Sequence, residues 1–177
     1  GAYDNASGVS LLLALAEAVS LSPERPPRPL LFVATTAEES GLLGAEWYAR
    51  HPLYPLSTTA AALNVDGANL WGPTHDITPL GTDRSELGDM VRAAAEAEGM
   101  EVAPEPHPEQ GMFFRQDHFP FARAGIPALA MDHGLRYAGR PEGWGEERYQ
   151  EFNTHHYHQA SDSYRDDFYY GGAVQQG

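Results

Sequence analysis

The chain has 177 residues, of which 42% are hydrophobic, and this length suits a single domain with a substantial core. Eleven lysines and arginines against 25 aspartates and glutamates give a net charge of −14, which disfavours nucleic acid and anionic membranes as partners and favours cations. The absence of cysteine excludes disulfides and thiolate ligands, so any bound metal must be held by oxygen and nitrogen atoms.

No apolar run approaches the roughly 20 residues that a membrane span needs, and no signal peptide is recognisable. The sequence opens inside a motif at Gly1, and residues 175–177 read as the start of a helix. We therefore expect the chain to be truncated at both ends.

The predicted elements of the first third alternate between helix and strand. Residues 9–19 are strong helix formers and are too apolar for a surface helix, so they predict a helix packed on a sheet. After a proline-dense connection at 22–29, the apolar run 30–35 predicts a strand buried on both faces. Residues 41–50 then predict a short helix, and residues 58–65 predict a second buried strand.

The rest of the chain continues this alternation. Residues 76–80 predict a strand and residues 100–103 an edge strand, while residues 126–131 predict a third buried strand. Residues 85–98 predict an amphipathic helix that ends at Gly99 and has one apolar stripe, made of Leu87, Met90, Val91 and Ala94. The polar, glycine-rich stretch 132–154 predicts a long loop over the end of the sheet.

Acidic residues stand where these elements begin or end. Asp4 precedes the first helix, Glu38 and Glu39 follow the first strand, and Asp66 follows the second. Ligands of open α/β sheets bind outside the carboxyl ends of the strands. Taken alone, Asp4 is explained more simply as a helix N-cap. With the later histidines, the acids predict a metal site of carboxylate and imidazole ligands; these histidines are His155, His156 and His158.

A mixed aromatic and polar segment, residues 113–121, comes before the last predicted strand. It contains Asp117 and His118 between phenylalanines. Such a composition suits either the wall of a substrate pocket or a buried polar network, and the sequence leaves both interpretations open.

Five motifs, taken in order, resemble the signatures of the co-catalytic zinc aminopeptidases, a family that includes glutamate carboxypeptidase II and glutaminyl cyclase. The motifs are GAYDNASG at 1–8, AEESGLLG at 37–44, LNVD at 63–66, DHFPFARAGIPA at 117–128 and YHQASD at 157–162. The resemblance runs to about residue 167. It implies an α/β fold of three layers, α/β/α, with a mixed, mostly parallel central sheet that is incomplete at the N-terminus. Residues 1–177 are then a single, partial zinc peptidase catalytic domain.

The resemblance also implies the metal ligands. Asp4 bridges two zinc ions, Glu39 and His158 complete the first site, and Asp66 serves the second. A further histidine of the family, in a His-x-Asp motif, is expected upstream of Gly1. Asp162 is expected to accept a hydrogen bond from the ring of His158.

Two catalytic roles follow from the same resemblance. Glu38, next to a ligand, is the expected general base. Tyr157 resembles a tyrosine that hydrogen-bonds the tetrahedral intermediate in some members. Asp117 and His118 are expected around the site or in the substrate pocket.

The expected function is a zinc aminopeptidase that acts on peptides. The alternatives are a glutaminyl cyclase-like transferase with one zinc and a non-catalytic relative used for binding. A glutamate carboxypeptidase is disfavoured, because its acidic substrates need a basic pocket and the chain has only eleven lysines and arginines. The resemblance suggests a secreted or periplasmic protein, and the sequence makes no prediction of oligomeric state.

Overall fold

The computed structural model describes residues 1–164, and its strands pair in parallel. β1 (Ala62–Val65) lies beside β4 (Ala128–Met131), with Ala62 opposite Ala128 and Val65 opposite Met131. β2 (Asp76–Ile77) lies beside β3 (Glu101–Val102). A single bridge from Leu80 to Ala130 places the segment after β2 on the other side of β4. The predicted strands at 58–65, 76–80, 100–103 and 126–131 are therefore present in shortened form. The burial predicted for 58–65 is wrong, because no residue of β1 is buried and Leu63 is 62% exposed.

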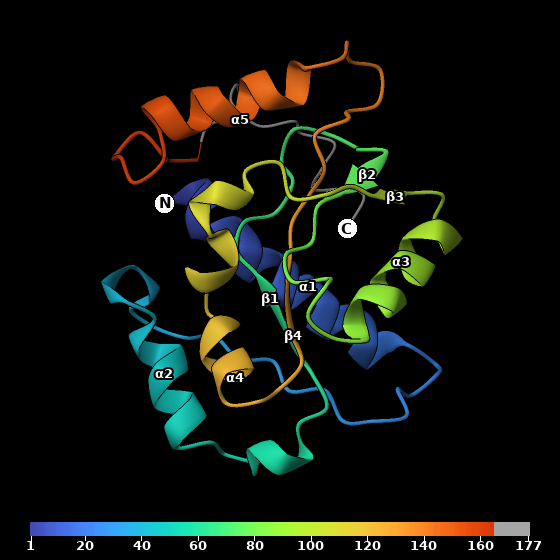
Figure 1. Cartoon of the computed structure of the whole chain (residues 1–177), viewed down its shortest axis with the longest axis vertical. Coiled ribbons are helices and arrows are strands. Elements are labelled where there is room, and N and C mark those ends of the chain that lie inside the picture. The colour runs from blue at the N-terminus through green and yellow to red at the C-terminus, as the bar shows by residue number, and fades with distance from the viewer. Residues whose placement is uncertain (165–177) are drawn as a thin grey trace.

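Helices surround the β1–β4 pair. α1 packs against β1 and crosses behind the pair in Figure 1, while α4 packs against β4 and α2 against α4. These helices and parallel strands confirm the predicted α/β class. In the part of the chain that is described, no helix is long and apolar enough to span a membrane. The helix bounds are α1 Gly8–Leu21, α2 Leu43–Arg50, α3 Leu87–Ala97, α4 Phe119–Arg123 and α5 Trp144–His155.

Shorter helical turns connect these elements. One irregular turn, Ala2–Ser7, leads into α1, and Asp4 and Asn5 within it have non-helical backbone angles. Single 3-10 turns occur at Glu38–Ser40, Leu56–Thr58, Pro108–Gln110 and Met112–Phe114. The helix start predicted at 175–177 lies outside the described residues.

The prediction of a buried strand at residues 30–35 is wrong. The segment has no strand partner among the described residues, and Leu30, Leu31 and Phe32 are exposed. A strand needs a neighbour to accept and donate its ladder hydrogen bonds. The apolar run alone predicted burial, but it carries no information about that neighbour.

The prediction of one continuous loop over 132–154 is also wrong, because α5 occupies its second half. Gly143 has φ +81° and permits the turn that starts the helix. Gln150 donates to Glu146 at 2.6 Å, and Arg148 pairs with Glu151, so neighbouring turns are linked on the polar side. Phe152 anchors the other side, packing with Trp71 and Tyr137 in a buried cluster.

The apolar stripe predicted on α3 is only partly correct. The helix stops as predicted, and Gly99 has φ +70°. However, its buried residues are Gly88 and Ala95, whereas Met90 is 64% exposed. Gly88 lies against Thr82, where an added Cβ would come within 1.9 Å of the Thr82 carbonyl oxygen. The backbone of α3 therefore packs closely against Thr82 at Gly88, and the helix is not held by a buried stripe of large side chains.

A second buried cluster, beside β4, contains a histidine in an apolar setting. His118 is 1% exposed, its ring packs on Phe113 at 4.7 Å between centroids, and neither ring nitrogen has a hydrogen-bond partner among the described residues. Burial, followed by the charge of Arg84, lowers the pKa of His118 to about 4. The folded protein therefore holds this ring neutral.

This arrangement predicts a loss of stability in acid. The unfolded histidine takes up a proton below its ordinary pKa of about 6.5, whereas the folded one does so only near 4. The contribution of His118 to stability is therefore present above pH 6.5 and is lost as the pH falls to 4, by on the order of 3 kcal/mol. Urea unfolding of the wild type and His118→Leu across this range measures it.

Between pH 6.5 and 4 the free energy of unfolding of the wild type should fall by this amount relative to that of His118→Leu. This comparison cancels the other titrating groups, among them Glu38 and Asp66, whose raised pKa values act in the opposite direction. The control His51→Leu removes an exposed histidine and should leave the wild-type slope in place. Equal slopes for the wild type and His118→Leu would contradict the assignment of a neutral, buried imidazole at position 118.

Candidate metal centre and substrate cleft

Three residues predicted as metal ligands come together although they lie in distant parts of the sequence. Asp4 precedes α1, Glu39 lies in the Glu38–Ser40 turn, and His158 follows α5. The Nε2 atom of His158 is 3.3 Å from Asp4 Oδ2 and 2.9 Å from Glu39 Oε1. One ligand atom from each residue lies within 4.8 Å of the other two. We call Asp4, Glu39 and His158 the ligand triad.

The triad fits zinc in both chemistry and spacing. Imidazole nitrogen and carboxylate oxygen are accepted zinc ligands, and atoms bound to one tetrahedral zinc at about 2.0–2.1 Å lie roughly 3.3 Å apart. The two distances from His158 to the carboxylates are close to this spacing. Three protein ligands leave a fourth position for water or substrate, which is the arrangement of a catalytic rather than a structural zinc site.

The backbone around two of these ligands adopts rare conformations. His158 has φ +58°, while Ala37 and Leu42, which flank the Glu38–Ser40 turn, have φ +56° and +60°. Residues with a Cβ pay an energetic penalty in this left-handed region, and such residues gather at functional sites. The fold therefore holds both ligand segments in conformations that local sequence preference opposes.

Asp4 itself is fixed through its backbone by Asp162. The two Asp162 carboxylate oxygens accept hydrogen bonds from the amides of Tyr3 at 2.8 Å and Asp4 at 3.0 Å. Asp162 is buried. The structure thus places this carboxylate on the ligand Asp4, and its predicted hydrogen bond from the His158 ring stays a prediction.

The simpler interpretation of Asp4, as the cap of α1, is not what the structure shows. The first amide of α1, from Gly8, donates to Asn5 Oδ1 at 3.1 Å. The Asp4 carboxylate instead faces His158. Asn5 supplies the cap, which leaves Asp4 available as a ligand.

The triad opens onto a cleft of about 740 Å³. Glu38 and Asp66 also line the cleft, close enough to the triad carboxylates for their charges to act on one another. The 110–119 segment and α5 contribute both apolar and polar side chains, with Arg115 and Gln116 among the polar ones. A cleft of this size suits a small ligand or the end of a peptide. Its aromatic and apolar lining includes Leu42, Met112, Phe114, Phe119, Tyr149, Phe152 and Tyr157.

The carboxylates of the cleft raise one another's pKa values. Burial, then the charges of Asp66 and Glu39, raises the pKa of Glu38 to about 7. Burial, then the charge of Asp4, raises the pKa of Asp66 to about 6. Burial and Glu39 also raise the pKa of Asp4, against a smaller opposing effect of His158. Crowded acids of this kind are relieved by a bound cation, which lowers such pKa values again.

Tyr157 lies beside the triad. Its ring stacks on that of His158, with centroids 3.7 Å apart, and it lines the cleft. Burial and the charges of Asp4 and Glu39 raise its pKa to about 12. The phenol therefore stays protonated at neutral pH and can donate a hydrogen bond into the cleft.

The segment 113–121 contributes both to the wall of the cleft and to a buried polar network, the two roles that its sequence left open. Phe114 and Phe119 line the cleft as a pocket wall, while buried Gln116 accepts a hydrogen bond from Asn64 at 3.2 Å. Asp117 accepts a hydrogen bond from Thr35, and its charge contributes to the raised pKa of Glu38. His118, in the apolar cluster beside β4, is not among the residues that line the cleft.

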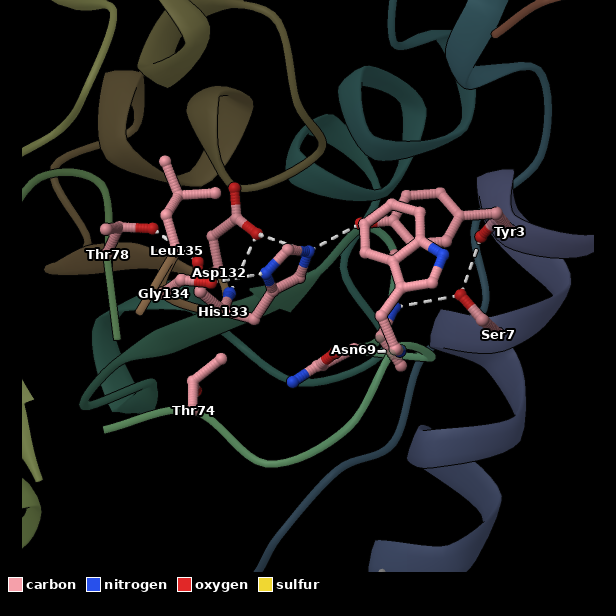
Figure 2. Close-up of polar contacts among 12 residues, drawn as sticks. Tyr3, Ser7, Asn69, Thr74, Thr78, Asp132, His133, Gly134 and Leu135 are labelled. Carbon is pink, nitrogen blue, oxygen red and sulfur yellow. Dashed lines mark hydrogen bonds and ion pairs between the residues drawn. The ribbon is translucent and has the colours of Figure 1, made fainter. Parts of the chain in front are cut away.

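A polar network that sequence reasoning missed adjoins Asp4 through its neighbour Tyr3. The Tyr3 hydroxyl is 2.7 Å from His133 Nε2 (Figure 2). The Tyr3 ring stacks on Trp71. Asp132 accepts from the His133 amide and also lines the cleft. Asp132 directly follows β4, so the signal that pointed to Asp66, an acid at a strand end, was present here too.

Comparisons with known proteins find similarity to peptidases. Residues 1–169 match peptidase family M28. Leupeptin-inactivating enzyme 1 from Streptomyces exfoliatus is 30% identical over 175 residues, which cover 92% of this chain and 36% of that protein. A solved zinc aminopeptidase from Bacillus subtilis is 26% identical with a TM-score of 0.60, over 81% of this chain and 35% of that one.

A further likeness shows the fold alone. The solved glutaminyl cyclase of Bacteroides thetaiotaomicron is 21% identical with a TM-score of 0.52, over 82% of this chain and 54% of that one. The chain spans 36% of the curated Streptomyces relative, about a third of its length. Because the family match covers nearly all of the sequence, the chain belongs to peptidase family M28.

Proposed function

We propose that the chain is part of the catalytic domain of a zinc-dependent aminopeptidase that removes N-terminal residues from peptides. The observation that carries this proposal is the meeting of Asp4, Glu39 and His158 beside Glu38 in an open cleft. Membership of a peptidase family and the 26% identity to a zinc aminopeptidase support it. The same resemblance supports a secreted or periplasmic location.

We assign some residues of the cleft to zinc binding and others to proton transfer and hydrogen bonding. The triad would hold one zinc, and Asp4 with Asp66 would contribute to a second. When bound, zinc supplies a water molecule of lowered pKa and polarises the scissile carbonyl. Glu38 lies in the same cleft next to the ligand Glu39, yet outside the triad, so its carboxylate is free to accept a proton.

Glu38 then acts as the general base. It takes a proton from the attacking water and delivers it to the leaving amine, which completes the cleavage of the peptide bond. Burial and neighbouring acids favour its protonated form in the metal-free protein, and bound cations restore the carboxylate. Tyr157 donates a hydrogen bond to the oxyanion that forms when the carbonyl is attacked.

The alternatives have less support. Similarity to glutaminyl cyclase lies at 21% identity and concerns the fold alone. A non-catalytic binding relative has no need of competent groups at Asp4, Glu38, Glu39, Asp66 and His158 together. Incubation with a peptide that begins with glutamine separates the two enzymes, because a cyclase releases ammonia whereas an aminopeptidase releases glutamine.

Replacing each of the two glutamates separates their roles. We expect Glu38→Gln to keep its zinc and to lose turnover by about 10²–10⁴-fold, since this is the usual contribution of a general base. Glu39→Gln should lose zinc, because an amide is a weaker ligand than a carboxylate. Elemental analysis after dialysis and turnover of an aminoacyl anilide measure the two effects. Full zinc and similar rates in both variants would contradict the assignment.

The two zinc sites should fill unequally in this chain. Among the described residues only the triad brings three such ligand atoms together, and the second zinc would be held by Asp4 and Asp66. A missing direct ligand should cost at least the 10–100-fold in affinity that loss of a ligand's hydrogen-bond partner typically costs. Zinc titration against a chromophoric chelator should therefore give one tight and one weak step. Two equally tight sites would refute this description of the second site.

A further inference from the structure

The side chain of Asn5 joins the two segments that carry Asp4 and Asp66. Its Oδ1 atom accepts hydrogen bonds from the amides of Gly8 at 3.1 Å and Gly67 at 2.9 Å. Its Nδ2 atom points to the Val65 carbonyl oxygen at 3.5 Å. Asn5 directly follows Asp4 in the sequence, and its side chain contacts the residue on each side of Asp66.

Ser7 makes a second connection between the same segments. Its hydroxyl donates to the Tyr3 carbonyl oxygen at 2.6 Å and accepts from the Ala68 amide at 2.8 Å. Figure 2 shows the Ser7 hydroxyl with these two contacts, beside the Tyr3 side chain. Ser7 is buried, so water does not compete freely for its bonds. We call the side chains of Asn5 and Ser7 the loop brace.

The local sequence is built for this close approach. A Cβ at Gly8 would lie 2.1 Å from Asn5 Oδ1 and 2.8 Å from the Val65 carbonyl oxygen, so only glycine leaves room for the bonds. Gly67 has φ +91°, which turns its amide toward Asn5 at no cost to a side chain. The brace therefore depends on glycines in both segments.

We propose that Asn5 is a positioning residue that sets the spacing between Asp4 and Asp66 and so makes the two carboxylates able to share neighbouring cations. The inference rests on the proposed function, since it assigns Asn5 a role toward the two zinc sites. The opposite side of the Asp4 segment is held separately, by Asp162 on the amides of Tyr3 and Asp4. Loss of Asn5 therefore removes the hydrogen bonds on both sides of Asp66 and leaves Ser7 and the β1–β4 pairing as its remaining supports, while Asp4 stays with Glu39 and His158.

The test is Asn5→Ala in the 177-residue chain, with zinc affinities measured by chelator competition. The weak step, which needs Asp66, should weaken by about 10–100-fold, the usual cost of losing a hydrogen-bond partner of a ligand. The tight step, which belongs to the triad, should stay close to its wild-type value. A purely structural defect would instead weaken both steps together.

A control variant makes the comparison sharp. Ser10→Ala removes a hydroxyl from α1 that bonds only to the Ala6 carbonyl oxygen, at 2.7 Å, and it should change neither step.

Hydrogen exchange of single amides provides a readout that needs no metal. The Gly67 amide should be protected in the wild type and should lose that protection in Asn5→Ala, while the amides that pair β1 with β4 stay protected. An unprotected Gly67 amide in the wild type would overturn the brace. Lost protection with both zinc steps unchanged would overturn the positioning role. A wild-type chain that binds no zinc would refute the proposed function and this role with it, whereas the exchange result would still report on the hydrogen bonds.

Discussion

Mutual repulsion among the carboxylates of the cleft is the constraint on which the structure of the site depends. Asp4, Glu38, Glu39 and Asp66 line the cleft in a chain that already carries a net charge of −14. The raised pKa values of Glu38 and Asp66 record first the cost of burying these carboxylates and then their mutual repulsion. A bound cation would offset both costs, as the proposed metal site requires.

The fold holds the Asp4 segment in place against this repulsion through hydrogen bonds to its backbone and through aromatic packing. The Asp4 turn is fixed by Asp162 on its amides, by the Tyr3 side chain against Trp71 and His133, and by the loop brace. The parallel register places Val65 opposite Met131, so that the acids after each strand, Asp66 and Asp132, leave the same edge of the pair and both line the cleft.

Parts of this organisation could be predicted because they depend on simple local rules. Asp66 stood at the end of an apolar run, and parallel strands deliver such residues to one edge. Asp132 carried the same signal and was overlooked because the stretch after it was taken for a loop. The sequence did not predict α5 because the helix buries mainly one large apolar side chain, Phe152, and so shows no apolar periodicity. Hydrogen bonds between its polar side chains, such as Gln150 to Glu146, also stabilise it.

Other features depend on tertiary structure and leave no trace in the sequence. The positive φ angles of Ala37, Leu42 and His158 oppose local preference and exist only because the surrounding contacts impose them. The run 30–35 predicted a strand, but a strand is defined by its partner, and none pairs with it in the described part of the chain. The resemblance to a family implied the roles of the ligands. The role of Asn5 depends on its hydrogen bonds to the amides of Gly8 and Gly67, which no local sequence pattern predicts.

The proposed function requires that Asp4, Glu39 and His158 together bind zinc. Anomalous diffraction from crystals of the chain grown with zinc, with data collected on both sides of the zinc absorption edge, tests this binding. We expect an anomalous peak within bonding distance of one carboxylate oxygen of Asp4, one of Glu39 and Nε2 of His158. Fully occupied zinc elsewhere, with no peak between these three side chains, would contradict it.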